Sequence, residues 1–321
     1  MMLVHIRRGV MLMLLVVMGA SAQTYPTKPV RIIVGFAAGG SGDLIARLVG
    51  QKLTEALGQQ FIVENRPGAS SNIGAAYVSK AAPDGYTLLM GSQTLAANMS
   101  LFKQLPFDLR RDFAPVVLID KQPYVLVVHP SVPAKTVQQF IDLAKSRPGR
   151  LNYASSGPGS GQHMAAEQFI MMTDIKIVHI TYKGGAPAVN DLIGGQVDLM
   201  IGPVPETMSF VQAGKLRGLA LTSVRRQGML PDVPTMQEAG LKGYEHVGWH
   251  GLYAPAGSPK DIIIRLNAAV NKALASSDLP KRLEGLGLEV AGGTMEEFQA
   301  IMEKEIEKSA RLVKTSGMQL Q

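Results

Sequence analysis

The stretch Gly35-Phe36-Ala37-Ala38-Gly39-Gly40-Ser41-Gly42-Asp43 joins an apolar run to an amphipathic one and decides the fold. The run before it, from Val30 to Val34, has the length and composition of a buried strand. After it, apolar residues recur at helical spacing from Leu44 to Leu57. A second such stretch, Ser155-Ser156-Gly157-Pro158-Gly159-Ser160-Gly161, stands later in the chain. Each stretch predicts a strand, a loose turn and the beginning of a helix.

Both turns are candidate anion sites. The N–H groups in the first turn of a helix have no partner inside the helix, and they lie at the positive end of its dipole. Two such turns on one chain indicate two jaws that close on a carboxylate or phosphate. Taken singly, each is also explained as an ordinary turn, because glycine permits the chain to reverse. Neither matches the dinucleotide-binding pattern, and no phosphate-binding P-loop sequence occurs, so nucleotide binding is disfavoured.

The N-terminal residues have the features of a secretory signal peptide. Arg7 and Arg8 precede an apolar run from Val10 to Met18, and the small residues Gly19-Ala20-Ser21-Ala22 follow it. The run is shorter than the roughly twenty residues that span a membrane. We therefore expect residues 1–22 to be removed after Ala22 and the mature protein to be periplasmic. The absence of cysteine excludes disulfides, thiolate metal sites and lipid attachment through an N-terminal cysteine.

The charge and its distribution bear on the kind of partner. The formal net charge is +7, and removing Arg7 and Arg8 with the signal peptide leaves +5. A mild positive excess suits an anionic ligand without proving one. The basic residues are scattered and aromatic residues are few, so we expect no nucleic-acid binding.

Short apolar runs alternate with helical patterns almost throughout, which predicts an α/β protein whose strands are mainly parallel. The predicted strands are 30–36, 61–64, 87–90, 116–119, 125–128, 151–154, 177–180, 197–201, 216–222 and 247–253. The clearest predicted helices are 136–145, 186–193, 261–275 and 295–313.

A chain of this length usually divides into two domains. Two extended stretches without helical character, Lys121–Tyr124 and Tyr244–Gly251, are the predicted crossings between them. We therefore expect domain 1 to contain residues 23–123 and 250–321, and domain 2 to contain residues 124–249. A domain interrupted by another and joined to it by two crossings is typical of a hinge.

The sequence gives little support for catalysis or for metal binding. The hydrolase pattern G-x-S-x-G does not occur. Ser160, His163 and Asp43 could still assemble in space, but their spacing does not favour this, and we expect His163 to face the loop or to pack locally. His246 and His250 lack the helical context of a metal site. We expect neither an enzyme nor a cofactor.

A series of further motifs runs in order along nearly the whole mature chain. They are Thr27–Phe36 with Gly39, Gly40 and Asp43, then Val63–Ala69, Asn72–Gly74, Ala82–Leu88, Tyr153–Gly157, Tyr182–Gly184, Gly194–Asp198, Pro231–Thr235 and Gly248–Trp249. Together these motifs resemble the Bug solute receptors, the extracytoplasmic binding components of tripartite tricarboxylate transporters. The resemblance implies a two-domain periplasmic-binding-protein fold (Venus flytrap, type II) that closes on its ligand. It also implies small carboxylated ligands and membrane carrier subunits as partners. We expect a monomer.

The resemblance also assigns candidate site residues. The turns Gly35–Asp43 and Ser155–Ser160 match the ligand pincers of the family, where backbone N–H groups, small hydroxyls and water hold a carboxylate. Taken together, the predicted ligand-binding residues are Phe36, Gly39, Gly40, Ser41, Asp43, Ser92, Gln93, Thr94, Ser155, Ser156, Gly159, Ser160, His163, Tyr182, Lys183, Pro203 and Trp249.

Several of these residues have an alternative structural interpretation. Ser92–Thr94 follow a strand at its C-terminal end, where open α/β sheets bind ligands, but they also suit a helix cap. Lys183 either binds a distal carboxylate of the ligand or is a solvated turn residue. Asp43 caps its helix or accepts a hydrogen bond from the ligand.

One segment departs from the family pattern. Ile201–Glu206 is apolar and proline-rich where many relatives carry an acidic or larger residue. This disfavours an amine-binding specificity and favours a less polar distal part of the ligand, unless Glu206 points inward. The sequence therefore predicts a receptor for a small organic anion that feeds a secondary transporter. The alternatives are a ligand sensor that addresses a membrane signalling partner and, more remotely, an exported hydrolase.

Overall fold

The structure is a computed structural model that describes residues 25–318. The predicted signal peptide, residues 1–22, and its cleavage site lie outside the described residues. No helix between residues 25 and 318 is both long enough and apolar enough to cross a membrane.

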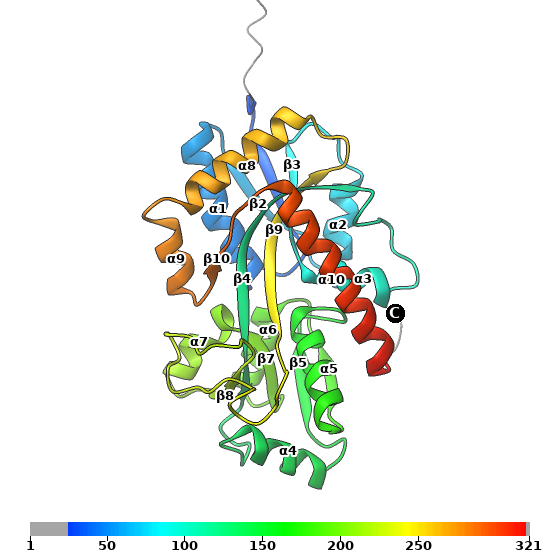
Figure 1. Ribbon diagram of the computed structural model, residues 1–321, viewed down its shortest axis with the longest axis vertical. Helices are drawn as coiled ribbons and strands as arrows, with labels where there is room; N and C mark the ends of the chain where they lie inside the picture. The colour runs from blue at the N-terminus through cyan, green and yellow to red at the C-terminus, as the bar shows by residue number, and fades with distance from the viewer. Residues whose placement is uncertain (1–24, 319–321) are drawn as a thin grey trace, which may run out of the picture.

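The described chain folds into two lobes stacked along the long axis of the molecule (Figure 1). We call them the first lobe (residues 25–119 and 250–318) and the second lobe (residues 124–246). The strands of the first lobe are β1 (Val30–Val34), β2 (Phe61–Asn65), β3 (Thr87–Ser92) and β10 (Glu289–Val290). Those of the second lobe are β5 (Asn152–Ser155), β6 (Val178–Thr181), β7 (Leu199–Pro203) and β8 (Arg217–Leu221). Two strands, β4 (Phe113–Val128) and β9 (Val247–Pro255), run from one lobe into the other.

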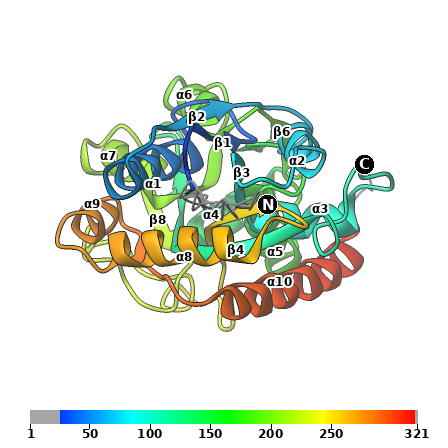
Figure 2. The ribbon, with the colours of Figure 1, turned by 90° about the horizontal axis from the view of Figure 1, so that it is seen from above.

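Helices cover the sheet of each lobe (Figures 1 and 2). The first lobe has α1 (Ser41–Leu57), α2 (Asn72–Ser79), α3 (Gln93–Leu101), α8 (Lys260–Leu274), α9 (Leu279–Gly285) and α10 (Met295–Ser316). The second lobe has α4 (Val137–Ser146), α5 (Gly161–Thr173), α6 (Gly185–Ile193) and α7 (Val204–Gln212). Figure 1 shows α10 descending from the first lobe towards α5 of the second.

The strands form one hydrogen-bonded path, β2-β1-β3-β9-β4-β7-β5-β6, from which β8 and β10 branch at β4. Pairings inside each lobe that follow a helical crossover are parallel, as in β1 with β2 and β3. Every pairing of β4 or β9 is antiparallel. The expectation of mainly parallel strands is therefore wrong for this part of the sheet. The chain leaves the first lobe along β4 and returns along β9, so these strands must run in opposite directions.

The two strand runs predicted at 116–119 and 125–128 are one continuous strand. Residues 121–124, predicted as a crossing, lie inside β4, where residues 121–123 pair with Val247–Trp249 of β9. The predicted domain bounds at residues 123 and 250 thus fall inside the two shared strands. The exact bounds remain a prediction.

Each lobe has its own apolar core. In the first lobe, Val30, Ile32, Val49 and Leu88 are among the residues that pack one face of β1 and β3 against α1 and α8. In the second lobe, clusters around Phe140 and around Met200 fill the two faces of the sheet. A small cluster of Ala97, Leu101, Met164 and Val313 joins α3 and α10 to α5 across the lobes.

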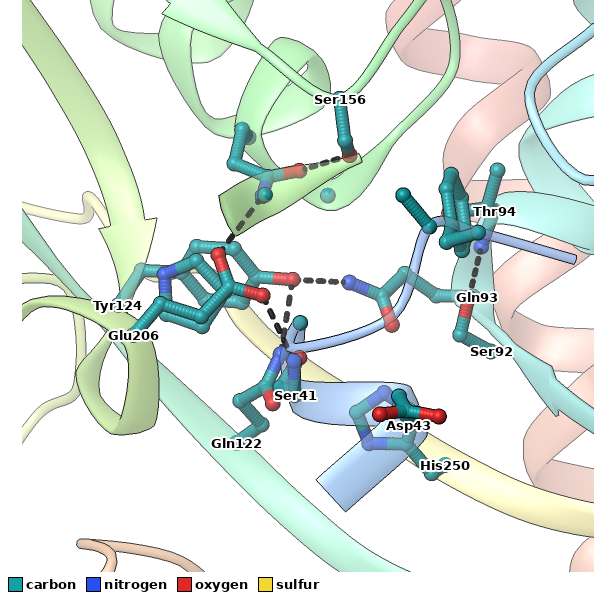
Figure 3. A pocket seen from close by; sticks show the side chains of 18 residues that line it. Ser41, Asp43, Ser92, Gln93, Thr94, Gln122, Tyr124, Ser156, Glu206 and His250 are labelled. Carbon is teal, nitrogen blue, oxygen red and sulfur yellow. Dashed lines mark hydrogen bonds between the residues drawn. The ribbon is translucent and has the colours of Figure 1, made fainter. Parts of the chain in front are cut away.

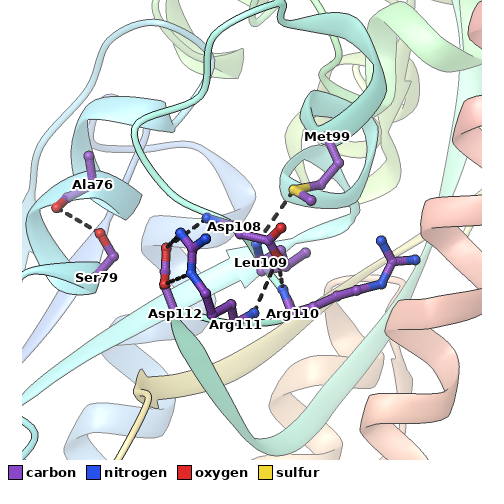
Figure 4. Close-up of polar contacts among 8 residues, drawn as sticks. All are labelled: Ala76, Ser79, Met99, Asp108, Leu109, Arg110, Arg111 and Asp112. Atoms are coloured by element: carbon purple, nitrogen blue, oxygen red, sulfur yellow. Dashed lines mark hydrogen bonds and ion pairs between the residues drawn. The ribbon is translucent and has the colours of Figure 1, made fainter.

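The connection from α3 to β4 is fixed by its own polar contacts (Figure 4). The carboxylate of Asp108 accepts hydrogen bonds from the N–H groups of Arg110, at 2.8 Å, and Arg111, at 3.2 Å. Asp112 accepts one from the N–H of Asp108 at 2.8 Å, and the N–H of Leu109 donates to the sulfur of Met99 at 3.4 Å. These bonds form a tight turn that sets the beginning of β4 at Phe113.

We expect Phe298→Ala to destabilise the protein by about 3–5 kcal/mol, because truncating a buried aromatic side chain removes apolar contacts and leaves a cavity. Phe298 of α10 is fully buried and packs on Trp249 and Tyr253 of β9, with ring centroids 5.5 Å and 4.9 Å away. Urea unfolding measures the loss. Ile264→Ala on α8 is the control, since Ile264 is 47% exposed. A change below about 1 kcal/mol for Phe298→Ala would contradict this packing role.

Candidate functional site

A small cavity lies between the lobes, where α1 and α3 of the first lobe face α5, α6 and α7 of the second (Figure 3). Its volume is about 40 Å³, enough for a few water molecules. The predicted residues that line it are Phe36, Gly40, Ser41, Asp43, Ser92, Gln93, Thr94, Ser156 and Pro203. It is also lined by Ala37, Gly42, Gln122, Tyr124, Gly161, Gln162, Gly185, Glu206 and His250, which sequence reasoning did not select as ligand-binding residues.

The first jaw is the N-terminus of α1. Gly40 precedes the helix in an extended conformation and offers no side-chain cap, and Gly39 adopts a φ of +84°. The N–H of Gly39 donates to Oδ2 of Asp43 at 3.0 Å, and Arg47 holds the same carboxylate through bonds of 2.9 and 3.1 Å. Asp43 therefore supports the turn from inside the helix while also lining the cavity. The N–H of Ser41 faces the cavity.

The hydrogen-bond partners of Asp43 favour its ionised form. Burial opposes ionisation, but hydrogen bonds from Arg47 and Gly39 outweigh it and lower the pKa of this carboxyl. Arg47 approaches from the solvent side and is half exposed. The charge of Asp43 is thus balanced outside the cavity.

The second jaw is the N-terminus of α5. The Oγ of Ser160 caps this helix by accepting a hydrogen bond from the N–H of His163 at 3.3 Å. The next residue must be glycine, because a Cβ on Gly161 would overlap the Tyr124 hydroxyl and the Gln93 carboxamide nitrogen. Within residues 25–318, no hydrogen bond occupies the N–H of Gly42, Gly161 or Gln162. These donors stay available in both jaws.

Four predicted residues support the second jaw from behind instead of lining the cavity: Ser155, Gly159, Ser160 and His163. The N–H of Gly159 donates to Nδ1 of His163 at 3.0 Å, so the proton of the neutral ring is on Nε2. His163 stacks on His179 at 4.3 Å, and His179 contacts Oγ of Ser155 at 2.6 Å. His163 faces its own loop, as one of the two interpretations of the sequence held.

The strands supply a polar stripe that sequence reasoning missed. Asp120, Gln122 and Tyr124 alternate along β4 and are almost completely buried. The Tyr124 hydroxyl accepts hydrogen bonds from Gln93, at 2.7 Å, and from Gln122, at 3.2 Å. Burial raises the pKa of Tyr124, so its own O–H remains a donor for a further acceptor. Polar residues at positions 120, 122 and 124, between the apolar runs 116–119 and 125–128, were the available signal.

Two acceptors near the cavity have no partner. Oε1 of Gln122 and Oδ2 of Asp120 are buried without a hydrogen bond. The other oxygen of Asp120 lies 3.2 Å from Nδ1 of His250, on the adjacent strand β9. Buried orphan acceptors are costly, which makes them sites where a ligand hydroxyl or a water would bind favourably.

Glu206 crosses from the second lobe to the first jaw. Its Oε1 accepts a hydrogen bond from the N–H of Ser41 at 2.8 Å, and its Oε2 lies 3.4 Å from the carboxamide nitrogen of Gln162 (Figure 3). Ser156 orients that carboxamide through a 2.6 Å hydrogen bond to Gln162 Oε1. Burial raises the pKa of Glu206, and the hydrogen bonds from Ser41 oppose the rise. The sequence left open whether Glu206 points inward, and the structure places it inward.

The remaining predicted residues lie away from the central cavity. Tyr182 and Lys183 line a separate hollow of about 330 Å³ that shares Phe36 and Ser156 with it. The Tyr182 hydroxyl donates to Asp191 at 2.8 Å, and the exposed Lys183 accepts a hydrogen bond at its carbonyl from Ala37 N–H at 3.3 Å. The Trp249 ring packs on Phe298, while its backbone N–H donates to Gln93 at 3.0 Å.

Ser92 and Thr94 form a helix cap at the edge of the cavity, and their contact with a ligand stays a prediction. Ser92 caps α3 by accepting a hydrogen bond from the N–H of Thr94 at 3.4 Å, and both residues line the cavity.

No residue that lines the cavity is lysine or arginine. Among residues 25–318, no group of three or more His, Cys, Asp or Glu side chains is placed to hold a metal ion. The polar groups that the described residues present to the cavity include helix N-termini, a phenol and carboxamides.

Two lobes joined by extended strands, with helix N-termini meeting in the cleft, define a solute-binding protein of the two-domain periplasmic-binding class. Comparison with known proteins gives the family. A family model described as a tripartite tricarboxylate transporter family receptor matches residues 45–318. The chain belongs to this family, which confirms the resemblance drawn from its motifs.

Relatives and solved structures agree with the assignment. The chain is 36% identical to the protein BugT of Bordetella pertussis over 302 residues, which cover 94% of this chain and 93% of BugT. A Rhodopseudomonas palustris protein solved with adipate is 38% identical, with a TM-score of 0.89 and coverage of 91% of this chain and 98% of that one. MatC from the same species, solved with bound malate, is 33% identical, with a TM-score of 0.87 and coverage of 90% and 100%. The predicted fold class is therefore confirmed.

We expect Gly161→Ala to weaken binding of a carboxylic acid at least about tenfold, or about 1.4 kcal/mol, because the new Cβ displaces Tyr124 and Gln93 from the cavity. Calorimetry with an acid that binds the unaltered protein measures the effect. Gly228→Ala is the matched control, since no atom lies within 4 Å of a Cβ at that position. An unchanged dissociation constant for Gly161→Ala would contradict the assignment of the second jaw.

We expect the free energy of unfolding to fall as pH drops from about 6.5 towards 4. Burial lowers the pKa of His163 to about 3 and that of His179 to about 4, and it also lowers the pKa of His246. In the unfolded chain these groups bind protons below about pH 6.5, so acid favours unfolding by up to about 1.4 kcal/mol per pH unit for each histidine.

Urea unfolding between pH 7.5 and 5, above the range where carboxylates dominate, tests this dependence. The variant His163→Gln should show a shallower dependence than the unaltered protein. Equal slopes for the two proteins would show that His163 does not remain neutral in the folded state.

Proposed function

We propose that this protein is a periplasmic receptor that closes its two lobes on a small carboxylate-bearing organic anion and delivers it to the membrane subunits of a tripartite tricarboxylate transporter. The observation that carries the proposal is the meeting of the α1 and α5 N-termini at one cavity, where the N–H of Ser41 already binds a carboxylate, that of Glu206. Helix N-termini favour anions through their free N–H groups and their dipole.

The proposed ligand class follows from the donors. The free N–H groups of Gly161 and Gln162 and the Tyr124 hydroxyl suit a carboxylate, while the orphan Oε1 of Gln122 suits a hydroxyl or other donor on the same ligand. The relatives solved with adipate and with malate support a dicarboxylate or a hydroxy acid. The basic start, apolar run and Ala20-Ser21-Ala22 of the N-terminus support export with cleavage after Ala22.

A signalling role for the same binding event is the alternative. A monomeric receptor that feeds a carrier and one that addresses a membrane sensor would close on their ligand in the same way. Neighbouring genes for multi-pass carrier subunits would favour the first, and a neighbouring membrane kinase or cyclase would favour the second.

We also propose that the protein does not catalyse hydrolysis. The Oγ of Ser160 faces the backbone N–H of His163 and not its ring. Ser155 does contact a histidine ring, that of His179, but Ser155 is fully buried behind the second jaw. A serine nucleophile must reach its substrate as well as its base.

Thermal unfolding in the presence of organic acids tests the receptor function. We expect malate, adipate or a related di- or tricarboxylate to stabilise the protein, since a ligand at a hundred times its dissociation constant adds about 2.7 kcal/mol. The diamide of the same acid is the matched control and should produce no shift, because it lacks the anionic oxygens. The absence of a shift with every carboxylate of a broad panel would contradict the proposal.

A further inference from the structure

Glu206 of the second lobe contacts a helix N-terminus of the first lobe in the way that an anionic ligand would. Its carboxylate projects from the first turn of α7 in the second lobe and accepts a hydrogen bond from Ser41 N–H at the beginning of α1 in the first lobe. A carboxylate oxygen on a free N–H of a helix N-terminus is the contact expected of a bound acid. Here the protein itself supplies that carboxylate.

Two glycines, Gly185 and Gly40, leave the space that the Glu206 carboxylate occupies across the cleft. A Cβ on Gly185, at the beginning of α6, would overlap the Glu206 carboxylate, and a Cβ on Gly40 would come within 3.3 Å of it. Gln162, held by Ser156, offers a second donor. Four helix N-termini, those of α1, α5, α6 and α7, thus surround one carboxylate, and no lysine or arginine lines the cavity.

This contact is one of few that join the lobes. Within residues 25–318 and away from the shared strands β4 and β9, two hydrogen bonds cross the cleft: Ser41 N–H to Glu206 and Ala37 N–H to the carbonyl of Lys183. Glu206 makes the shorter one, at 2.8 Å against 3.3 Å, and it is the one made by a side chain. Apolar contacts of Met164 with Leu101 and Val313 accompany them.

Glu206 also has space into which it could move. It lines the central cavity on one side and, on the other, a surface hollow of about 200 Å³ formed with Gly39, Ala186 and Phe210. A rotation of the side chain towards that hollow would free the N–H of Ser41 without moving α7. An arriving carboxylate could then occupy the vacated position.

We propose that Glu206 is an internal ligand of the receptor: its carboxylate holds the lobes together in the absence of solute, and a solute carboxylate must displace it from Ser41. The proposal rests on the proposed function for the identity of the competing ligand, but not for the contact itself. It makes Glu206 a determinant of affinity and of the lobe arrangement before binding.

Distance measurement between the lobes tests the internal contact without any ligand. The chain contains no cysteine, so spin labels attach only at Ile73→Cys on α2 and Val178→Cys on β6, which are 55% and 46% exposed. The protein is unfolded in guanidinium, dialysed and refolded to remove co-purified acids. We expect the doubly labelled parent to give one short distance, and Glu206→Ala in this background to add a longer distance in at least half of the molecules.

Two further variants show whether an opening of the lobes is caused by loss of the Glu206–Ser41 contact. One removes the contact from the Ser41 side, and the other removes a glutamate that makes no contact between the lobes. Ser41→Pro removes the N–H that Glu206 binds but keeps the helix, because proline is favoured at the first helical position and Gly40 before it is extended. We expect it to open the lobes as Glu206→Ala does. Glu238→Ala is the control, since Glu238 bonds only to Thr235 and Arg226 within the second lobe, and it should keep the short distance.

Identical distance distributions for the parent, Glu206→Ala and Ser41→Pro would overturn the proposal, and so would a parent that is already open. Calorimetry with malate and adipate supplies a second test. Removing an internal competitor should tighten binding about fivefold or more in Glu206→Ala, whereas a loss of affinity would show that Glu206 contacts the ligand instead. If neither acid binds any variant, the proposed function is in question, while the distances still decide whether Glu206 holds the lobes.

Discussion

The N–H groups in the first turn of a helix cannot be satisfied by the helix itself, and this protein directs several of them at one point between its lobes. The arrangement depends on where α1 and α5 begin. Gly40 and Ser160 end their turns so that Ser41 and Gly161 face each other across a cavity of about 40 Å³. The polar groups of β4 then fill the space between the jaws. The cavity therefore offers directed dipoles rather than a buried cation, and burying dipoles costs less desolvation free energy than burying a charge.

The parts of the fold that follow from local patterns were predictable. The strand, turn and helix around Gly35–Asp43 lie where the sequence predicts them, with β1 at Val30–Val34 and α1 at Ser41–Leu57. The same holds for the turn before α5. Apolar spacing and glycine placement act within a few residues, so one sequence is enough to detect them. Half of the residues that line the cavity were predicted: Phe36, Gly40, Ser41, Asp43 and Ser156 stand in the two turns, and the family resemblance added Ser92–Thr94 and Pro203.

The other half depends on contacts between segments far apart in the chain. Gln122 and Tyr124 stand in a strand that was predicted as two pieces with a crossing between them, and only the continuous β4 brings their side chains to the jaws. His250 joins them because β9 pairs with β4 opposite Asp120. Glu206 lies 165 residues from Ser41, and its direction is set by the packing of α7 and not by its neighbours in sequence. The antiparallel order of β4 and β9 is likewise a consequence of the return path of the chain.

The two lobes share continuous strands instead of being tethered by loops. Any opening must therefore bend a two-stranded ribbon, and bending concentrates where the ribbon is least stiff. Residues 121–123 pair with 247–249 between the lobes, where Pro123 has no N–H to give to the ladder and Gly248 has no Cβ. The Gln93 carboxamide fills the position that a side chain on Gly248 would take. The same carboxamide bonds to Tyr124 and to the backbone of Trp249, so this section of the ribbon is joined directly to the wall of the cavity. A bend of the ribbon at this section would therefore move groups that line the cavity.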